Sequence, residues 1–417
     1  MLFVKSDRLK VGMRLARPIY NKNGVLLYER NSKLTPQGIV SINNFGLIGI
    51  YILEPAEPVP PMTQDDIEFE RFQTMCVFAI GEVLMGLIEN KKAPKMYTLA
   101  SGIIKSYGKL DRKINFIQNL RSNEDYIFKH TLNVSILCAL MAHKLKVKAD
   151  EQFDVVTAAI VHEIGKLAYQ KSIKQPNLTP EEEAKRIKRA EIAGFDMIAD
   201  VLSNSTSLKR ICLQSQRMLD DFAEGITEST VKPSIGTKIM MVAEVFDSMT
   251  AMHNENEPSS EVSAVRYLLE NNQVFDKEVV RALIDSIHLL SPGTCIELNT
   301  GEKGLVLNDN DVDFLMPYIL LFTNNKVVDL ADRKNYKDLE IKDIMKTLDN
   351  RHVMDTELLK QHGYAVAEQE NVKESDIVAP EYVDELRDVA SEIKSTEGTD
   401  GGTDADLEEE YVPGRDF

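Results

Sequence analysis

The chain has 417 residues, 43% of them apolar, which is enough for two or three domains with at least one sizeable core. Its net charge is −17, but residues 366–417 hold 17 acids and 4 bases and so carry −13 of it. Charges interrupt the apolar runs before the roughly 18 residues that a membrane span requires, and the first residues lack the apolar region of a signal peptide. We therefore predict a cytoplasmic protein without a membrane span, and no basic, aromatic cluster indicates DNA or RNA as a partner.

Residues 1–53 have the pattern of a small α+β module. The stretches GMRLARPIY, VLLYE and GLIGIYIL resemble short strands, NKNG is a turn between the first two, and LTPQGIVSINNFG has the pattern of a capped helix. Residues 54–65 contain EPAEPVPP, and proline at this density predicts an extended linker.

Residues 66–290 change to the apolar spacing of helices. Segments such as YIFKHTLNVSILCALMAHKL, FDVVTAAIVHEIGKLAY and IGTKIMMVAEVFDSMTAM place apolar residues three and four positions apart, which predicts a helical bundle. The cysteines lie far apart, and three of the four fall in such helical patterns, which favours reduced, buried thiols over disulfides or a zinc site. These cysteines are Cys76, Cys138, Cys212 and Cys295.

Residues 291–335 return to short apolar runs separated by the turns NTG, NDND and NNK, which predicts a C-terminal β extension. Residues 336–365 are predicted to be a helical segment. The acidic residues 366–417 bury too little apolar surface to offset the entropy of ordering, so we expect a disordered tail. The predicted fold is therefore mainly α, with a bundle flanked by a small α+β module and a β extension.

Four side chains in the helical part are candidate metal ligands, namely His130, His162, Glu163 and Glu244. Separate helices can each aim one rigid imidazole or carboxylate at a common point, which is how helical bundles hold divalent metals. The sequence leaves two alternatives open. Either one ion lies among the four side chains, or the side chains hydrogen-bond to one another inside the bundle.

These residues lie in motifs that occur in a fixed order: HTLNV at His130, HEIGK at 162–166, PNLTPEEEAKRIKRAEIAGFDMI at 176–198, and VAEVFDSMTA around Glu244. The order resembles the HD-GYP branch of the HD phosphohydrolases. The likeness includes LKVGMRLARPIYNKNGVLLYERNSKLT and SPGTCIELNTGEKGLVL, so it extends over roughly residues 5–335. It implies an HD-type helical bundle that hydrolyses cyclic di-GMP, a bacterial second messenger, with two or three iron or manganese ions.

The family pattern implies five histidines in the metal site, and this sequence retains two, His130 and His162. Glu163 replaces the Asp of the His-Asp pair, and Glu244 replaces a later Asp ligand. The glycine-tyrosine-proline stretch is absent. We therefore predict a residual site that holds at most one divalent ion, manganese or iron, or no ion.

Other positions at which the family pattern has a metal ligand carry side chains that bind such metals poorly or not at all. These are Ala190, Gln214, Ser215 and Gln216. Two cations match positions that can contact phosphate, Lys166 after the His-Glu pair and Arg217 after the altered triplet.

The resemblance and the lost ligands together predict a degenerate HD-GYP protein. The leading interpretation is a regulatory or binding module in bacterial cyclic di-GMP signalling, with phosphodiesterase activity lost or reduced and with the nucleotide or another signalling protein as partner. One alternative is an active metal-dependent phosphodiesterase with an altered site. A second is a signalling scaffold that resembles the HDOD domains and binds no nucleotide.

Overall fold

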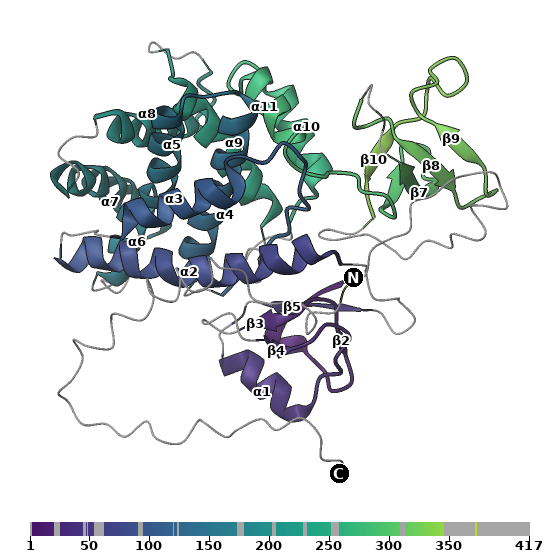
Figure 1. Ribbon diagram of the computed structural model, residues 1–417, viewed down its shortest axis with the longest axis horizontal. Coiled ribbons are helices and arrows are strands. Elements are labelled where there is room, and N and C mark those ends of the chain that lie inside the picture. Colours follow the sequence, from purple (N-terminus) through teal and green to yellow (C-terminus); the bar gives the residue numbers. More distant parts are fainter. Residues whose placement is uncertain are drawn as a thin grey trace.

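The computed structural model has three parts, an N-terminal α+β module, a central helical bundle and a C-terminal sheet (Figure 1). This architecture confirms the mainly α fold. The structure describes residues 2–345 and Val372, apart from residues 21–25, 45–46, 48, 54–61, 91–94, 120, 123–124, 173–178, 202–205, 228–231, 252–257, 309 and 311–312. The predicted Pro-rich linker thus lies largely outside the described residues, as do residues 346–371 and 373–417.

The N-terminal module consists of two small antiparallel sheets and one helix. In the three-stranded sheet the order is β1-β5-β2, and the second sheet pairs β3 with β4. The helix α1 begins at a proline, whose fixed φ suits the first helical position, and Ile42 on its inner face is buried against the sheet. The bounds are β1 (Leu2–Lys5), β2 (Arg14–Leu15), β3 (Ile19–Tyr20), β4 (Leu26–Tyr28), α1 (Pro36–Asn44) and β5 (Gly49–Leu53), with a short 3-10 turn at Ser6–Arg8.

Ten helices among the described residues form the bundle, and α4 and α9 lie at its centre. Almost every residue of α4 from His130 to Ala142 is buried, so the polar side chains on this helix must find partners inside the protein. The helix α9 begins where Ser234 accepts a hydrogen bond from the backbone N–H of Thr237. The bounds are α2 (Gln64–Asn90), α3 (Met96–Tyr107), α4 (Tyr126–Lys144), α5 (Ala149–Val161), α6 (Ile164–Lys171), α7 (Pro180–Val201), α8 (Thr206–Ala223), α9 (Ile235–Thr250), α10 (Glu261–Glu270) and α11 (Lys277–Ile284).

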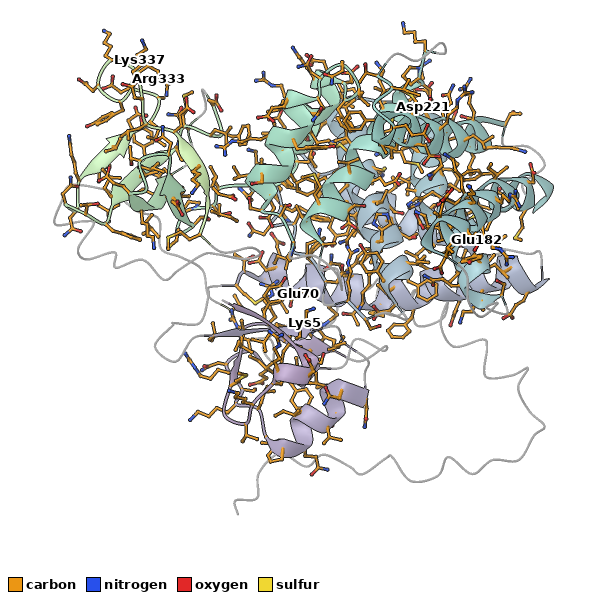
Figure 2. The ribbon with its side chains drawn as sticks, turned by 180° about the vertical axis from the view of Figure 1, so that it is seen from behind. Lys5, Glu70, Glu182, Asp221, Arg333 and Lys337 are labelled. Atoms are coloured by element: carbon orange, nitrogen blue, oxygen red, sulfur yellow. The ribbon has the colours of Figure 1, made fainter. Side chains whose placement is uncertain are left out.

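The N-terminal module packs against α2. Tyr51 and Leu53 of β5 belong to the same hydrophobic cluster as the bundle, and Arg17 forms an ion pair with Glu70 of α2. Figure 2 shows Glu70 on the side of α2 that faces the N-terminal module. Among the described residues, one helix, Gln64–Glu89, is long and apolar enough to cross a membrane, and 56% of its most apolar stretch is buried. One face of this helix packs into the core of the bundle, as expected for the core helix of a globular domain. Its length and apolar composition are therefore the only features that it shares with a membrane span.

The C-terminal part is a five-stranded antiparallel sheet in the order β10-β6-β7-β8-β9. The predicted helical segment 336–365 is wrong where the structure describes it, because Ile341 and Ile344 place their side chains in the core of this sheet. Arg266 of α10 donates to backbone carbonyls of β10 and ties the sheet to the bundle. The bounds are β6 (Cys295–Leu298), β7 (Lys303–Asn308), β8 (Tyr318–Leu321), β9 (Val327–Asp329) and β10 (Ile341–Ile344).

Val372 is the one residue of the predicted acidic tail that the structure describes. Its backbone N–H donates to the carbonyl of Met62 at 2.9 Å, and its carbonyl accepts from Arg30 at 2.5 Å. This residue therefore contacts both the start of the bundle and the N-terminal module. The rest of the predicted tail lies outside the described residues.

Candidate metal centre

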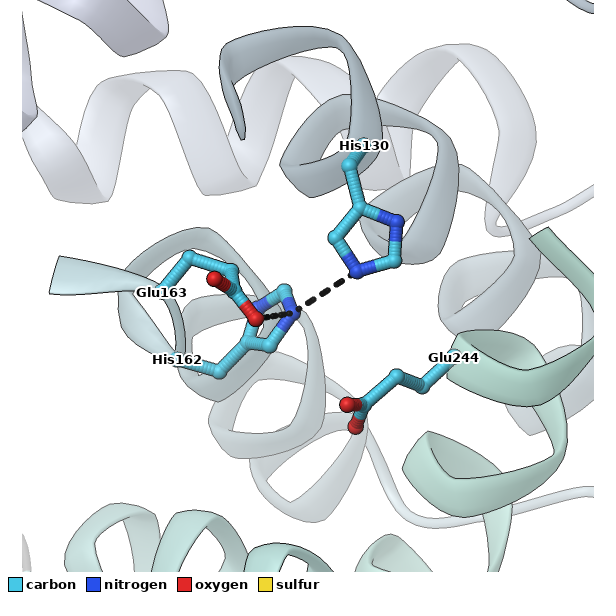
Figure 3. A group of neighbouring side chains, drawn as sticks. All are labelled: His130, His162, Glu163 and Glu244. Carbon is cyan, nitrogen blue, oxygen red and sulfur yellow. Dashed lines mark hydrogen bonds and ion pairs between the residues drawn. The ribbon is translucent and has the colours of Figure 1, made fainter. Parts of the chain in front are cut away.

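The fold brings the four candidate ligands together (Figure 3). His130 lies on α4, His162 at the end of α5, Glu163 between α5 and α6, and Glu244 on α9. One ligand atom from each side chain lies within 4.8 Å of the others. We call these four residues the His-Glu cluster. The two histidines and Glu163 are buried, and Glu244 is half-buried.

Hydrogen bonds fix how the two imidazole rings of the cluster are oriented. Nδ1 of His162 lies 2.6 Å from the carbonyl oxygen of Ala159, which can only accept, so this nitrogen carries the hydrogen. Nδ1 of His130 lies 2.6 Å from Oδ2 of Asp247 and donates to this carboxylate. The Nε2 atoms face each other at 3.4 Å. In the neutral rings both Nε2 atoms present lone pairs that repel each other, and a cation or a proton between them would relieve this repulsion.

Asp247 is the centre of a buried polar network behind His130. Arg121, which is fully buried, donates to both of its oxygens at 2.7 and 2.8 Å, and Gln118 and Asn133 donate to Oδ1 at 3.0 and 2.8 Å. Burial by itself raises the pKa of Asp247, but Arg121 and His130 outweigh burial and hold the pKa well below its usual range. The carboxylate is therefore ionised and holds the hydrogen of His130 on Nδ1.

Lys166 supplies positive charge on the other side of the cluster. Its ammonium lies 2.6 Å from Oε1 of Glu163 and 3.5 Å from Oε1 of Glu191. Burial raises the pKa of Glu163 on its own, but Lys166 and His162 outweigh burial and lower this pKa to about 2. Burial raises the pKa of Glu191. Glu163 is therefore anionic at neutral pH, and Oε1, the oxygen that Lys166 contacts, is also the one that faces Nε2 of His162, at 3.7 Å.

The two residues predicted to contact phosphate, Lys166 and Arg217, lie in different environments. Lys166 lies at the edge of the His-Glu cluster through its bond to Glu163. The side chain of Arg217 is 75% exposed and forms an ion pair of 3.8 Å with Asp221 one turn along α8. Arg217 is thus on the surface of α8 and is not part of the cluster, and its contact with phosphate remains a prediction.

Comparison with known proteins supports the likeness that the motifs show. Residues 115–279 match the sequence model of the HD domain family, a range that contains all four cluster residues. The chain is 23% identical over 206 residues to the cyclic di-GMP phosphodiesterase PA4108 of Pseudomonas aeruginosa, a match that covers 49% of each chain. It is 22% identical over 232 residues to the cyclic di-GMP phosphodiesterase PdeB of Borreliella burgdorferi, covering 54% of this chain and 60% of that protein.

Residues 115–279 of the helical bundle form an HD domain, and the two relatives support its resemblance to the HD-GYP branch. The chain spans about half the length of the curated relatives that it matches. A solved structure, "Bd1817, a HDG"Y"P protein from Bdellovibrio bacteriovorus", aligns over 68% of this chain and 98% of its own chain, with 16% identity and a TM-score of 0.40.

At Ala190 the HD domain brings two helices, α6 and α7, into close contact. A Cβ atom added to Gly165 of α6 would lie 2.4 Å from the carbonyl oxygen of Ala190 on α7. Gly194, one turn later on α7, meets the backbone of Gly165 in the same way. This contact of two glycines places the next side chain, Glu191, beside Lys166. The carboxylate of Glu191 thus lies next to a position where the family pattern has a histidine.

The three altered positions on α8 of the HD domain make hydrogen bonds within the protein. Gln214 accepts a hydrogen bond from the Thr237 hydroxyl at 3.0 Å. The Ser215 hydroxyl donates to a carbonyl of its own helix at 3.0 Å, and the Gln216 amide donates at 3.2 Å to an acid one turn later. Each of these three side chains thus has a hydrogen-bond partner outside the His-Glu cluster.

The His-Glu cluster of this HD domain fits one divalent ion. Two imidazole nitrogens and two carboxylate oxygens are a suitable ligand set, and each imidazole donates its other ring N–H to a carbonyl or carboxylate, as metal-bound histidines do. Opposite ligands of one ion with bonds of about 2.1 Å lie about 4.2 Å apart, so a cluster within 4.8 Å needs only a small closure. A second ion 3.5–4 Å away, as in two-metal sites, would require roughly as many ligands again.

Two residues important to this site were not predicted from the sequence, Asp247 and Glu191. Asp247 follows Glu244 by three positions in VAEVFDSMTA. A second acid on an apolar helix was the sequence feature that could have indicated a buried polar role for Asp247. Its partner Arg121 is far away in the sequence, and the pairing depends on the fold. Glu191 occurs among many exposed charges on α7, and no local pattern separates it from them.

Proposed function

We propose that this protein is a regulatory or binding module of cyclic di-GMP signalling whose phosphodiesterase activity is lost or reduced. The observation that carries the proposal is the His-Glu cluster, in which two histidines and two glutamates of the described residues lie within 4.8 Å and suit one cation. The relatives that share the HD domain are named cyclic di-GMP phosphodiesterases, which supports this nucleotide as the ligand.

In the proposed module, one manganese or iron ion would be held by His130, His162, Glu163 and Glu244. Such an ion supplies a Lewis acid that attracts the oxygens of a phosphodiester. Lys166, 34% exposed and beside Glu163, is positioned to add a charge-assisted contact to the same phosphate. The side chains of the cluster can therefore bind a phosphodiester even where too few ligands remain to drive its hydrolysis.

An active phosphodiesterase with an altered site is a second candidate, and one observation favours it. The Nδ1–H bonds to Asp247 and Ala159 orient both lone pairs toward a common point, which is the arrangement of a working metal site. In this case Glu163 and Glu244 would hold a catalytic metal ion. Glu163→Ala and His162→Ala should then each lower turnover by at least about a hundredfold.

The decisive experiment is isothermal titration of the purified full-length chain with cyclic di-GMP, with and without manganese, followed by a hydrolysis assay in the same buffers. Binding with little or no hydrolysis supports the proposed module. Metal-dependent turnover that both Glu163→Ala and His162→Ala abolish supports the active enzyme and overturns the proposal.

The absence of heat in both buffers would support the third interpretation, an HDOD-like scaffold that binds no nucleotide. Ser101→Phe, an exposed change on α3, serves as a control for the stability of the purified protein. Its titration should match that of the parent.

A further inference from the structure

Lys166 lies at the edge of the His-Glu cluster and contacts two carboxylates at once. Its ammonium nitrogen is 2.6 Å from Oε1 of Glu163 and 3.5 Å from Oε1 of Glu191. The side chains of these two acids are only 4% and 8% exposed, whereas that of Lys166 is 34% exposed. The ammonium therefore lies beside two nearly buried carboxylates, one from the cluster and one from α7.

The backbone of α6 and α7 holds this arrangement in place. Gly165 precedes Lys166 and Ala190 precedes Glu191, and a Cβ atom on Gly165 would lie 2.4 Å from the Ala190 carbonyl oxygen. Glu163 lies three residues before Lys166, and its Oε1 accepts a hydrogen bond from the lysine. Both carboxylates thus extend from tightly packed backbone, which fixes the position of the ammonium.

One oxygen atom connects the Lys166 ammonium to the candidate metal site. Oε1 of Glu163 accepts the hydrogen bond from Lys166 and also lies 3.7 Å from Nε2 of His162, the nitrogen that faces the cluster (Figure 3). The second ion of a two-metal site lies about 3.5–4 Å from the first. A cation that contacts an oxygen of the cluster therefore lies in the region where such a second ion would be.

The charges of these side chains match one divalent ion. In their ionised form Glu163, Glu191 and Glu244 supply three negative charges and Lys166 supplies one positive charge, which leaves a net charge of −2. The acid behind the cluster is already compensated by its own buried arginine. Without Lys166 the net charge would be −3, more than one divalent ion neutralises, and burial of uncompensated charge is costly.

We propose that the Lys166 ammonium takes the place of a second metal ion, so that the site combines one divalent ion with one cation of the chain itself. An ammonium donates hydrogen bonds but has no coordination position for a water, so it neutralises the charge of a phosphate without activating a water for attack. This inference rests on the proposed function, because it gives a physical reason for binding without hydrolysis. It also means that Lys166 limits how many metal ions the site holds.

The test counts manganese ions on the full-length chain, first made metal-free, by titration calorimetry and by elemental analysis after removal of unbound metal. The parent and Lys166→Arg, which keeps the positive charge, should each bind one ion. Lys166→Ala removes the charge and opens space beside Glu163 and Glu191. This variant should bind a second, weaker ion, whose electron paramagnetic resonance signal is coupled to that of the first. A single ion in Lys166→Ala overturns the proposal.

A double variant and a matched control locate the second ion. Lys166→Ala/Glu191→Ala also removes the carboxylate of α7, so it should return to one ion. Lys188 provides the control, because its ammonium contacts two acids, Asp220 and Glu224, at 3.1 and 3.7 Å, but its side chain is 51% exposed. Exposed charges interact weakly with cations, so Lys188→Ala should bind no more manganese than the parent. An equal gain in Lys188→Ala and Lys166→Ala contradicts the proposal.

A neutral residue of similar length keeps the proposal testable if Lys166→Ala does not fold. Lys166→Gln removes the charge with little change in size, and it should raise the affinity for the first manganese ion at least about tenfold, because the ammonium repels a neighbouring divalent ion. Thermal unfolding of the metal-free variants shows which of them are folded. Unchanged manganese affinity in Lys166→Gln overturns the proposal. The proposed function is decided separately, by titration of the parent with cyclic di-GMP, whose result does not depend on how many ions the Lys166 variants bind.

Discussion

Replacement of Asp247 by asparagine keeps the volume of the side chain and removes the negative charge from the middle of the bundle. Arg121 would lose the carboxylate that lies 2.7 Å from its guanidinium, and both residues are fully buried. Removal of one partner from a buried ion pair typically costs about 3–5 kcal/mol, because the remaining charge has no compensation. At about 2–4 °C per kcal/mol for a domain of this size, the melting temperature should fall by roughly 6–20 °C.

The same substitution should also change the hydrogen on His130. An asparagine oxygen still accepts from Nδ1, but if the amide instead turns its NH₂ to His130, the ring hydrogen moves to Nε2 and the lone pair that faces the cluster is lost. Loss of such a partner behind a metal-bound histidine typically weakens metal binding about 10–100-fold. We therefore expect Asp247→Asn to lower manganese affinity by this factor.

Calorimetry of the metal-free protein and titration with manganese measure the two effects of Asp247→Asn separately. The matched control is Asp196→Asn, which breaks an ion pair of 2.8 Å with Lys209 in which the Asp196 side chain is 70% exposed. Exposed pairs contribute about 0–1 kcal/mol, so this control should differ little from the parent.

The double variant Arg121→Met/Asp247→Asn removes both buried charges, so it should regain part of the stability but not the manganese affinity. A melting temperature for Asp247→Asn equal to that of the Asp196→Asn control would refute the role assigned to this network.

Three further predictions concern the metal, the α6–α7 contact and acid stability. Protein purified without chelator should carry at most about one transition-metal ion per chain, and two or more ions by elemental analysis would contradict a one-ion cluster. Gly165→Ala should lower the melting temperature by several degrees, because its Cβ would lie 2.4 Å from the Ala190 carbonyl oxygen; Gly102→Ala, with nothing within 4 Å in helix α3, should raise stability by about 0.5–1 kcal/mol. Burial raises the pKa of Asp276, but its hydrogen bonds to Lys238 and to the start of α11 outweigh burial and lower it. A lowered pKa means that the carboxylate stabilises the fold above its ordinary pKa of 3.8 and loses this effect as the pH falls through the folded value. Denaturant unfolding should thus show Asp276→Asn less stable than the parent at pH 7, with the difference shrinking below about pH 4; a constant difference would assign it to another cause.

Local pattern was sufficient for most of the fold. The three- and four-residue spacing of apolar side chains marks α4, α5 and α9, because a helix that buries one face needs this spacing wherever it lies. The segment 336–365 was predicted to be helical, but part of it is the strand β10. The Ile341 and Ile344 side chains pack into the sheet core, and β10 pairs with β6, which is distant in the sequence. A four-residue edge strand carries little pattern of its own.

The identity of the candidate ligands also follows from the chain alone. Imidazole and carboxylate are chemical properties of single residues, and the order of His130, His162, Glu163 and Glu244 along separate helices predicted that they converge. The scarcity of histidine between residues 162 and 253 is likewise a fact of composition, and it limits the site to few ligands before any coordinates are known.

The state of those ligands depends on atoms that come together through folding. His130 keeps its lone pair toward the cluster because Asp247, 117 residues away in the chain, accepts its other ring hydrogen, and Asp247 is ionised because Arg121 is buried against it. Arg217 follows the altered triplet, yet the rotation of α8 leaves its side chain 75% exposed. Electrostatic interaction weakens with distance, and hydrogen bonds form only at donor–acceptor distances of about 3 Å, so charge state, tautomer and orientation are set by distances in space, which no spacing along the sequence specifies.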